Sequence, residues 1–331
     1  MRRQRVFTWH VHGSYLWYLT HAAQDFYVPV KPGRPEGYGG RAGSLPWPEN
    51  LHEVPAEDVR HLELDCVLFQ SRNNYLLDQY EILSDEQQRL PRIYLEHDPP
   101  RQHPTDTQHV VDDPNMLLVH VTQFNALMWD SGRTPTRVVE HGVTVDPNAH
   151  YTGEIERGAV VVNGLSKRGR RLGADLFDRV RRDVPLDIAG MGSEELGGEG
   201  DLSREALAQF VTKRRFFFNP IRYTSLGLAV CEAMMLGVPV IGLATTEMAT
   251  VIENGVSGYI DTDARRLIAV MQDLLHDPAE ARRLGEGARR TAERRFDIGR
   301  FAADWDDVFA QATGTPRTAE ALTSYGSGAT A

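Results

Sequence analysis

Short apolar runs alternate along the chain with longer stretches in which polar and apolar positions are mixed. In the first half these runs fall at residues 6–11, 64–69, 92–95, 116–121 and 137–140, and in the second half at 159–163 and 215–218. Such β-rich runs with helical segments between them predict βα units and parallel sheets. The 331 residues leave room for two domains of about 150 residues each.

Apolar positions recur at helical spacing over residues 267–275 and again from residue 279, which predicts two surface helices. A last helix is expected over 298–312. The segment 151–157 is polar without periodicity and is interpreted as a hinge. The segment 28–54 is rich in proline and glycine and is expected to be a long loop. It is either a functional loop that grips an acceptor or a disordered segment without a role.

The composition excludes several classes of protein. A hydrophobic content of 41% and a charged content of 25% are those of a globular protein. The net charge of -10 argues against a general nucleic-acid binder. Cys66 and Cys231 each lie in an apolar element and are expected in the core rather than in a disulfide or metal site. The start lacks an apolar signal segment, and no apolar run reaches the roughly 18 residues of a membrane span. We therefore expect a cytoplasmic protein with at most peripheral membrane contact.

The rest of the chain is organised around residues 215–241. A strand over 215–218 ends at Asn219-Pro220, and a polar turn leads into a helix expected from about residue 225 to 236. Thr224 or Ser225 is predicted to cap this helix. Its unpaired amide groups and the positive end of its dipole suit a phosphate group.

Glu232 is the acidic residue of this helix. Four apolar residues surround it at helical spacing: Leu228, Ala229, Met235 and Leu236. A helix that is apolar all round is expected to be buried, and a buried carboxylate needs partners. Two adjacent hydroxyl groups of a ligand or an arginine of the same chain would both satisfy it.

Cations gather after the run at 159–163. Lys167, Arg168, Arg170 and Arg171 lie within five residues of an otherwise acidic protein. They are interpreted as a phosphate-binding cluster, with a solvated charged face as the alternative. Gly190 and Gly192 predict a turn that approaches a nucleotide closely. It is no dinucleotide fingerprint, because Glu195 stands where the third glycine would be.

Histidines are concentrated in the first half. His10 and His12 precede Gly13, whose lack of a side chain permits a tight turn. Two residues apart on a strand, the two histidines are expected to point to the same side, and with His97 and Asp98 they could be imagined as metal ligands. The competing interpretation is that these histidines are polar groups at strand ends that line a cleft.

The run PIRYTSLGLAVCEAM resembles the signature of retaining glycosyltransferases of family 4, Pro-Ser-x-x-Glu-x-x-Gly with a second Glu two helical turns further on. Pro220, Gly227 and Glu232 match, whereas Thr224 stands at the first Glu. The resemblance implies an α/β protein with the GT-B fold, in which two Rossmann-like domains with parallel sheets face each other across a cleft. The implied parts are an acceptor-side domain at 1–152, a nucleotide-sugar-binding domain at 153–296, a helix crossing back at 297–312 and a disordered tail at 313–331.

The resemblance also implies roles for single residues. Glu232 holds the ribose of the donor nucleotide, and His97 contacts the transferred sugar. Arg168 and Arg171 neutralise the diphosphate, although the sequence does not decide among the four cations. The other implied donor-binding residues are Gly13, Gly192, Thr224, Ser225, Leu226 and Gly227. In the loop that follows, Thr246, Glu247 and Thr250 replace the family's Gly-Gly and later Glu, which suggests altered donor contacts.

The implied function is transfer of a hexose from a nucleoside-diphosphate sugar to a hydroxyl group with retention of configuration, without cofactor or metal. The acceptor is a saccharide, a lipid-linked molecule or a small molecule, and no nucleic acid is involved. Two other hypotheses stay open. Thr224 makes a catalytically silent sugar-nucleotide-binding protein conceivable, and the N-terminal histidines leave a metal-dependent hydrolase.

Overall fold

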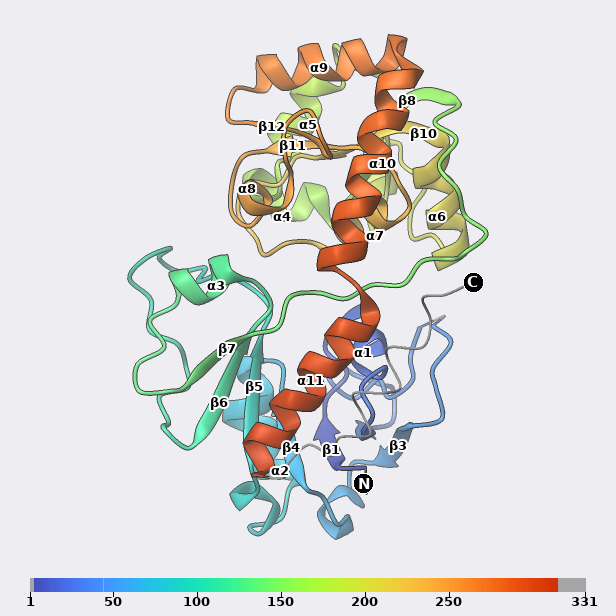
Figure 1. Ribbon diagram of the computed structural model, residues 1–331. Coiled ribbons are helices and arrows are strands. Elements are labelled where there is room, and N and C mark those ends of the chain that lie inside the picture. Colours follow the sequence, from blue (N-terminus) through green and yellow to red (C-terminus); the bar gives the residue numbers. More distant parts are fainter. Residues whose placement is uncertain (1–2, 44, 315–331) are drawn as a thin grey trace. The chain divides into compact units, whose positions relative to one another are not determined.

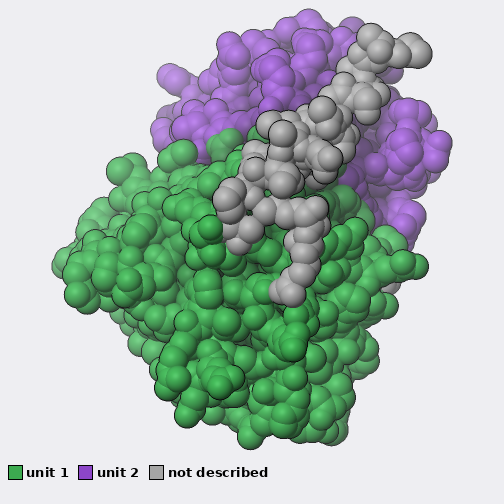
Figure 2. Space-filling view, turned by 60° about the horizontal axis from the view of Figure 1, so that its bottom comes forward, with its two compact units in different colours: residues 1–142, 298–331 green, residues 143–297 purple. Residues whose placement is uncertain are grey.

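The computed structural model describes residues 3–43 and 45–314, and the chain divides into two compact units. Unit 1 contains the chain up to Gly142 together with the segment from Ile298 onward, and unit 2 is Val143–Asp297. Figure 2 colours the two units separately. Each unit has its own sheet and its own hydrophobic core.

Unit 1 is built on seven parallel strands in the order β3-β2-β1-β4-β5-β6-β7. The strands are β1 (Arg5–Thr8), β2 (Asp25–Val30), β3 (Leu51–Pro55), β4 (Cys66–Phe69), β5 (Arg92–Glu96), β6 (Met116–His120) and β7 (Thr136–Val138). All residues of β4 and β6 are buried, as expected for inner strands covered on both faces. Parallel pairing places the carboxyl ends of all these strands at one edge, where ligands bind in such sheets.

Short helical segments and one long helix complete unit 1. They are α1 (Gly13–Leu19), η1 (Val59–His61), the π-helical η2 (Asn74–Asp78), α2 (Gln79–Ile82), η3 (Gln87–Arg89), α3 (Gln123–Met128) and α11 (Ile298–Thr313). The helix α11, drawn in red in Figure 1, packs on α1 and β4. Its Trp305 is fully buried and donates a hydrogen bond to the Tyr15 hydroxyl at 3.1 Å.

Unit 2 is built on five parallel strands in the order β12-β11-β10-β8-β9. The strands are β8 (Ile155–Val161), β9 (Leu186–Ala189), β10 (Arg214–Asn219), β11 (Val240–Leu243) and β12 (Gly258–Asp261). The chain reverses direction across the sheet between β9 and β10, which lie on opposite sides of β8. The β8–β10 boundary is therefore the topological switch point, the usual place for a ligand in an open α/β sheet.

The helices of unit 2 are α4 (Leu165–Leu172), α5 (Ala174–Val180), η4 (Ser193–Leu196), α6 (Arg204–Lys213), α7 (Leu228–Met235), α8 (Met248–Val251), α9 (Ala264–His276) and α10 (Pro278–Arg295). Helices α9 and α10 confirm the two surface helices predicted from the apolar spacing. Each begins after an aspartate whose carboxylate accepts a backbone N–H of the first turn, Asp263 for α9 and Asp277 for α10.

The sequence pattern found most strands but misjudged two segments. The segment 28–54 begins inside β2 and ends inside β3, which pair in parallel, and the long loop is confined to the described residues between these strands. The expected hinge at 151–157 is part of unit 2. Its last three residues lie in β8, and the Tyr151 hydroxyl donates to the carbonyl oxygen of Arg215 at 2.7 Å. The expected disordered tail lies outside the described residues from residue 315 on.

Both cysteines are buried in the core, as expected, and burial raises the pKa of the Cys66 thiol. Over the described residues, no helix combines the length and the apolar character that crossing a membrane requires.

A fully buried histidine ends strand β6. Neither ring nitrogen of His120 has a hydrogen-bond partner among the described residues. Burial, followed by the positive charge of nearby His109, lowers the pKa of His120 from 6.5 to about 4. The folded state therefore holds this ring neutral, while the unfolded chain takes up a proton near pH 6.5.

We expect stability to fall as the pH drops from about 6.5 to 4, by up to about 3 kcal/mol from His120 alone, because only the unfolded state gains the proton there. Urea unfolding at several pH values measures this loss. His120→Leu should flatten the pH dependence in this window, whereas the control His61→Leu at an exposed position should leave it unchanged. An equally steep dependence in His120→Leu would show that another group controls it.

Candidate functional site

The loops after β8 and β9 in unit 2 are joined by two hydrogen bonds. The Gly164 N–H donates to the carbonyl oxygen of Met191 at 2.8 Å, and the Met191 N–H donates to Oδ1 of Asn163 at 2.9 Å. Gly190 must be a glycine here, because its φ is +120° and a Cβ atom would lie 2.8 Å from Asn163 Oδ1. Gly192 also has a positive φ of 76° and begins η4. The predicted close backbone turn is therefore present, next to the end of β8.

The loop after β10 is held to helix α4 by several hydrogen bonds, two of which share one carbonyl group. The oxygen of Arg171 accepts from the N–H groups of Arg222 at 3.0 Å and Tyr223 at 3.3 Å. The backbones touch closely at Gly173, where a Cβ atom would lie 2.1 Å from the Pro220 oxygen. Helix α4, which carries Arg168 and Arg171, is thus joined to the loop at 220–227, and the turn with Gly192 is joined to the loop after β8.

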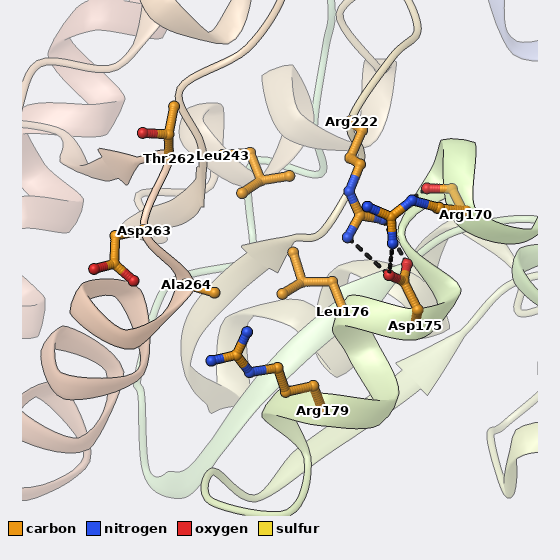
Figure 3. A pocket seen from close by; sticks show the side chains of 9 residues that line it. All are labelled: Arg170, Asp175, Leu176, Arg179, Arg222, Leu243, Thr262, Asp263 and Ala264. Carbon is orange, nitrogen blue, oxygen red and sulfur yellow. Dashed lines mark hydrogen bonds and ion pairs between the residues drawn. The ribbon is translucent and has the colours of Figure 1, made fainter.

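The cationic cluster lies on α4, which is interrupted at Gly169 by non-helical backbone angles. Arg170 and Arg222 both bind Asp175 at 2.5 Å, and Figure 3 shows the two guanidinium groups on its carboxylate. Hydrogen bonding from Arg222 lowers the pKa of Asp175. No hydrogen bond or ion pair among the described residues reaches the side chains of Lys167 or Arg171, and Arg168 is exposed. The structure thus separates Arg170, which has an anionic partner, from Lys167 and Arg171, which have none.

The central helix begins later than the sequence indicated. Helix α7 starts at Leu228 and its N-cap is Gly227, so the predicted caps Thr224 and Ser225 are wrong. Both lie in the preceding loop, Thr224 half-buried and Ser225 buried, next to the buried Leu226. The Ser225 Oγ has no hydrogen-bond partner among the described residues, and a Cβ atom at Gly227 would meet nothing within 4 Å. No side chain caps α7, and the N–H of Val230 in its first turn donates to the carbonyl oxygen of Gly227 at 3.0 Å.

Glu232 lies one turn into α7 on its less buried side. Val230, Cys231, Ala233 and Met234 are buried, whereas Leu228, Ala229, Glu232 and Met235 are only half-buried. The expectation of a helix that is buried all round is therefore wrong. The half-buried residues form a stripe along one side of the helix that includes Glu232. The sequence did not reveal this stripe, because its other residues are apolar like those of the buried side.

Gln70 connects three strand ends in unit 1, and sequence reasoning missed it. Its buried side-chain amide group donates to the Thr8 hydroxyl and to the carbonyl oxygen of Trp9, both at 2.9 Å, at the end of β1. Since the Trp9 oxygen can only accept, the Gln70 Oε1 atom must face His97, whose Nε2 lies 3.2 Å away. The Nε2 atom of His97 therefore carries the proton and donates it to Gln70.

His97 follows β5 and packs edge-on against the rings of His12 at 4.2 Å and Tyr15 at 4.8 Å between centroids. Burial lowers the pKa of His97 well below 6.5, and the positive charges of His12 and His141 lower it further. The imidazole is therefore neutral near pH 7, and its Nδ1 atom is a hydrogen-bond acceptor. The N–H group of the His97 ring is therefore engaged by Gln70.

The expected pairing of His10 with His12 is wrong. The His10 Nδ1 atom lies 2.6 Å from the carbonyl oxygen of Gly40, whereas His12 contacts His97. Strand β1 ends at Thr8, so the two histidines do not share a strand face. Gly13 begins α1, and a Cβ atom there would lie 2.9 Å from His10 Nε2. Within residues 3–43 and 45–314, no three His, Cys, Asp or Glu side chains are grouped so as to hold a metal ion.

The acidic residue of the loop after β11, Glu247, stabilises the position of this loop. Glu247 is 1% exposed, and its Oε1 atom accepts from Arg295 of α10 at 2.7 Å and from the Thr250 hydroxyl at 2.6 Å. Thr246 adopts a left-handed φ of 52°, which a β-branched residue rarely does. Glu247 and Thr250, expected to alter donor contacts, instead anchor this loop to α10.

Comparison with known proteins identifies the second unit. Residues 198–291 match the family "Glycosyl transferases group 1", so the chain carries a glycosyltransferase domain. A D-inositol 3-phosphate glycosyltransferase of Xylanimonas cellulosilytica is 35% identical over 115 residues, which are 34% of this chain and 27% of that protein. The chain thus spans about a quarter of the length of this relative.

Two solved structures resemble nearly the whole chain. A glycosyltransferase from Rickettsia africae has a TM-score of 0.70 at 12% identity and covers 96% of this chain and 100% of its own. The Anabaena protein Alr3699/HepE, solved with UDP, has a TM-score of 0.66 at 13% identity and covers 94% and 100%. The predicted GT-B fold, with two α/β domains on parallel sheets, is confirmed.

We expect Arg295→Ala to lower the free energy of unfolding by about 3 kcal/mol, because it leaves the buried carboxylate of Glu247 without its cation. Chemical denaturation measures the change. The control Arg294→Ala, on the exposed neighbouring position, should change stability by less than about 0.5 kcal/mol. Adding Glu247→Gln to Arg295→Ala should recover part of the loss; equal stability of the two single arginine variants would contradict the pairing.

Proposed function

We propose that this protein is a retaining glycosyltransferase of family 4. It transfers a hexose from a nucleoside-diphosphate sugar to an acceptor hydroxyl group. The observation that carries the proposal is that the loop leading into α7, a helix with no side-chain cap, is hydrogen-bonded to α4, whose Lys167 and Arg171 side chains have no partner among the described residues. The group 1 domain at residues 198–291 agrees with it.

The donor diphosphate is proposed to bind at the start of α7. There the amide groups near Leu226 and Gly227 and the hydroxyl groups of Thr224 and Ser225 can donate to phosphate oxygens. Arg171 supplies positive charge without having to leave a carboxylate partner, and Arg168 is the second candidate. Gly192 lets the backbone approach the nucleotide, and Glu232 accepts hydrogen bonds from the ribose hydroxyls.

In the proposed reaction the bond between the anomeric carbon and the β-phosphate oxygen breaks. The acceptor oxygen bonds to the same face of that carbon, and its proton passes to the departing phosphate. Fixed cations and helix amide groups stabilise the negative charge that grows on the diphosphate, which is the work a metal would otherwise do. His97, neutral and with its Nε2–H fixed by Gln70, accepts a hydrogen bond from a sugar hydroxyl at Nδ1, close to Gly13.

The class of the acceptor and the location of the protein in the cell stay predictions. The acceptor is a saccharide, a lipid-linked molecule or a small molecule, and the reaction is expected in the cytoplasm with membrane contact at most peripheral. Since the Anabaena protein was solved with UDP, UDP and its sugars come first in a ligand screen, before GDP and ADP.

Glu232→Ala should weaken nucleotide binding by about 10- to 100-fold, because the ribose hydroxyls lose a charged hydrogen-bond acceptor. Thermal shift first identifies the nucleotide, since a ligand at 100 times its Kd adds about 2.7 kcal/mol. Calorimetry then compares Glu232→Ala with the control Glu286→Ala, an exposed acid on α10. Unchanged affinity in a folded Glu232→Ala protein would refute the ribose assignment.

His97→Ala should lower kcat by about 100-fold while changing nucleotide affinity little, because His97 is proposed to position the sugar rather than the nucleotide. Steady-state transfer assays with the donor found in the screen measure this, and His61→Ala serves as the control at an exposed position. An unchanged kcat would remove His97 from the site. Wild-type protein that binds the donor but neither transfers nor hydrolyses it would be the catalytically silent binder.

A further inference from the structure

Unit 2 contains a pocket beside the predicted donor site. It has a volume of about 410 Å³, within the roughly 300–1,000 Å³ of small-molecule sites. Its walls come from α4, α5, the loop after β10, the end of β11 and the start of α9. Figure 3 shows the lining residues: Arg170, Asp175, Leu176, Arg179, Arg222, Leu243, Thr262, Asp263 and Ala264.

One wall of this pocket carries an excess of positive charge. Arg170 and Arg222 share the carboxylate of Asp175, and Arg222 binds it with two nitrogen atoms at 2.5 and 2.9 Å. Arg179 extends from α5 toward the pocket, and no hydrogen bond or ion pair among the described residues reaches its side chain. Three guanidinium groups and the carboxylate of Asp175 line the pocket, which leaves two positive charges before Asp263 is counted.

The opposite wall offers oxygen atoms over an apolar floor. Thr262 and Asp263 lie there, and Leu176, Leu243 and Ala264 form the apolar surface between the walls. Asp263 already accepts the N–H of Arg265 in the first turn of α9 and pairs with the Arg265 guanidinium group, so its charge does not cancel that of the arginine wall. Oxygen atoms of this kind suit the hydroxyl groups of a ligand, whose carbon skeleton can lie on the floor.

We propose that this pocket binds a small phosphate ester with several hydroxyl groups, of the size of a hexose phosphate. A phosphate monoester carries about two negative charges near pH 7, which matches the two unbalanced guanidinium charges. The three arginines are placed to donate to the phosphate oxygens. Thr262 and Asp263 are placed to bind hydroxyl groups.

The pocket is separate from the predicted donor site but connected to it. None of the predicted donor-binding residues lines it. Arg222, however, belongs to the loop at 220–227, and its N–H and that of Tyr223 bind the carbonyl oxygen of Arg171. A phosphate held by Arg222 would fix this loop and thereby raise nucleotide affinity. This coupling rests on the proposed function, whereas binding in the pocket does not.

Calorimetry on the full chain, with glucose 6-phosphate as probe and saturating UDP present to fill a diphosphate site, tests the proposal. Wild-type protein should bind the probe, and Arg179→Ala should bind it at least about tenfold more weakly. The control Arg182→Ala removes the same charge just after α5, outside the pocket, and should bind as wild type does. Absent binding, or equal loss in both variants, would overturn the proposal.

Further probes distinguish the contributions of the phosphate group, the hydroxyl groups and the nucleotide site. Inorganic phosphate should bind more weakly than glucose 6-phosphate, and glucose more weakly still; equal affinity for phosphate and ester would overturn the role of the hydroxyl-facing wall. Glu232→Ala should weaken nucleotide binding but leave glucose 6-phosphate binding unchanged. If wild-type protein binds glucose 6-phosphate and no nucleotide, the proposed function fails and the pocket stands. If it binds a nucleotide but not the ester, the pocket proposal fails alone.

Discussion

The candidate donor site depends on a few backbone hydrogen bonds that join three loops at one edge of a parallel sheet. The carbonyl oxygen of Arg171 holds the loop after β10, and Asn163 with Gly164 holds Met191 after β9. Because the bonds use backbone groups and one amide, they do not engage the side chains of Lys167 and Arg171 on α4. Backbone atoms fix positions more tightly than long side chains can, so a diphosphate would meet groups that are already in place.

In unit 1 a side chain, that of Gln70, joins the ends of neighbouring strands. Gln70 reaches the end of β1 with its amide group and His97 with its carbonyl oxygen, so its own orientation is determined. This sets the tautomer of His97, and burial keeps the ring neutral. The result is that Nδ1 of the neutral ring is a hydrogen-bond acceptor. A histidine fixed in this way can select a hydroxyl group but cannot act as an acid near pH 7.

Periodic patterns predicted the elements that local sequence controls. Buried strands such as β6 and β10 contain short apolar runs, and α9 and α10 show helical spacing with aspartate caps. The start of α7 was missed because Thr224 and Ser225 are good caps that the chain instead places in a loop joined to Arg171. Gln70 was missed because its partners lie on two other strands, and β2 was hidden by the prolines and glycines around it. Contacts between distant segments decided each of these cases.

Contacts between distant segments also distinguish the cations of α4, which the sequence alone left equivalent as phosphate ligands. Arg170 could bind a diphosphate only by weakening its bond to Asp175, whose low pKa shows that the carboxylate is stabilised as an anion. Arg171 has no such bond to lose, so an equal contact with phosphate leaves it a larger net gain. Arg170 and Arg222 are better suited to a second anion on their other side, where Arg179 adds its charge. Pairing with Asp175 thus distinguishes Arg170 and Arg222, which line the pocket proposed for a phosphate ester, from Arg171, which is proposed to bind the diphosphate.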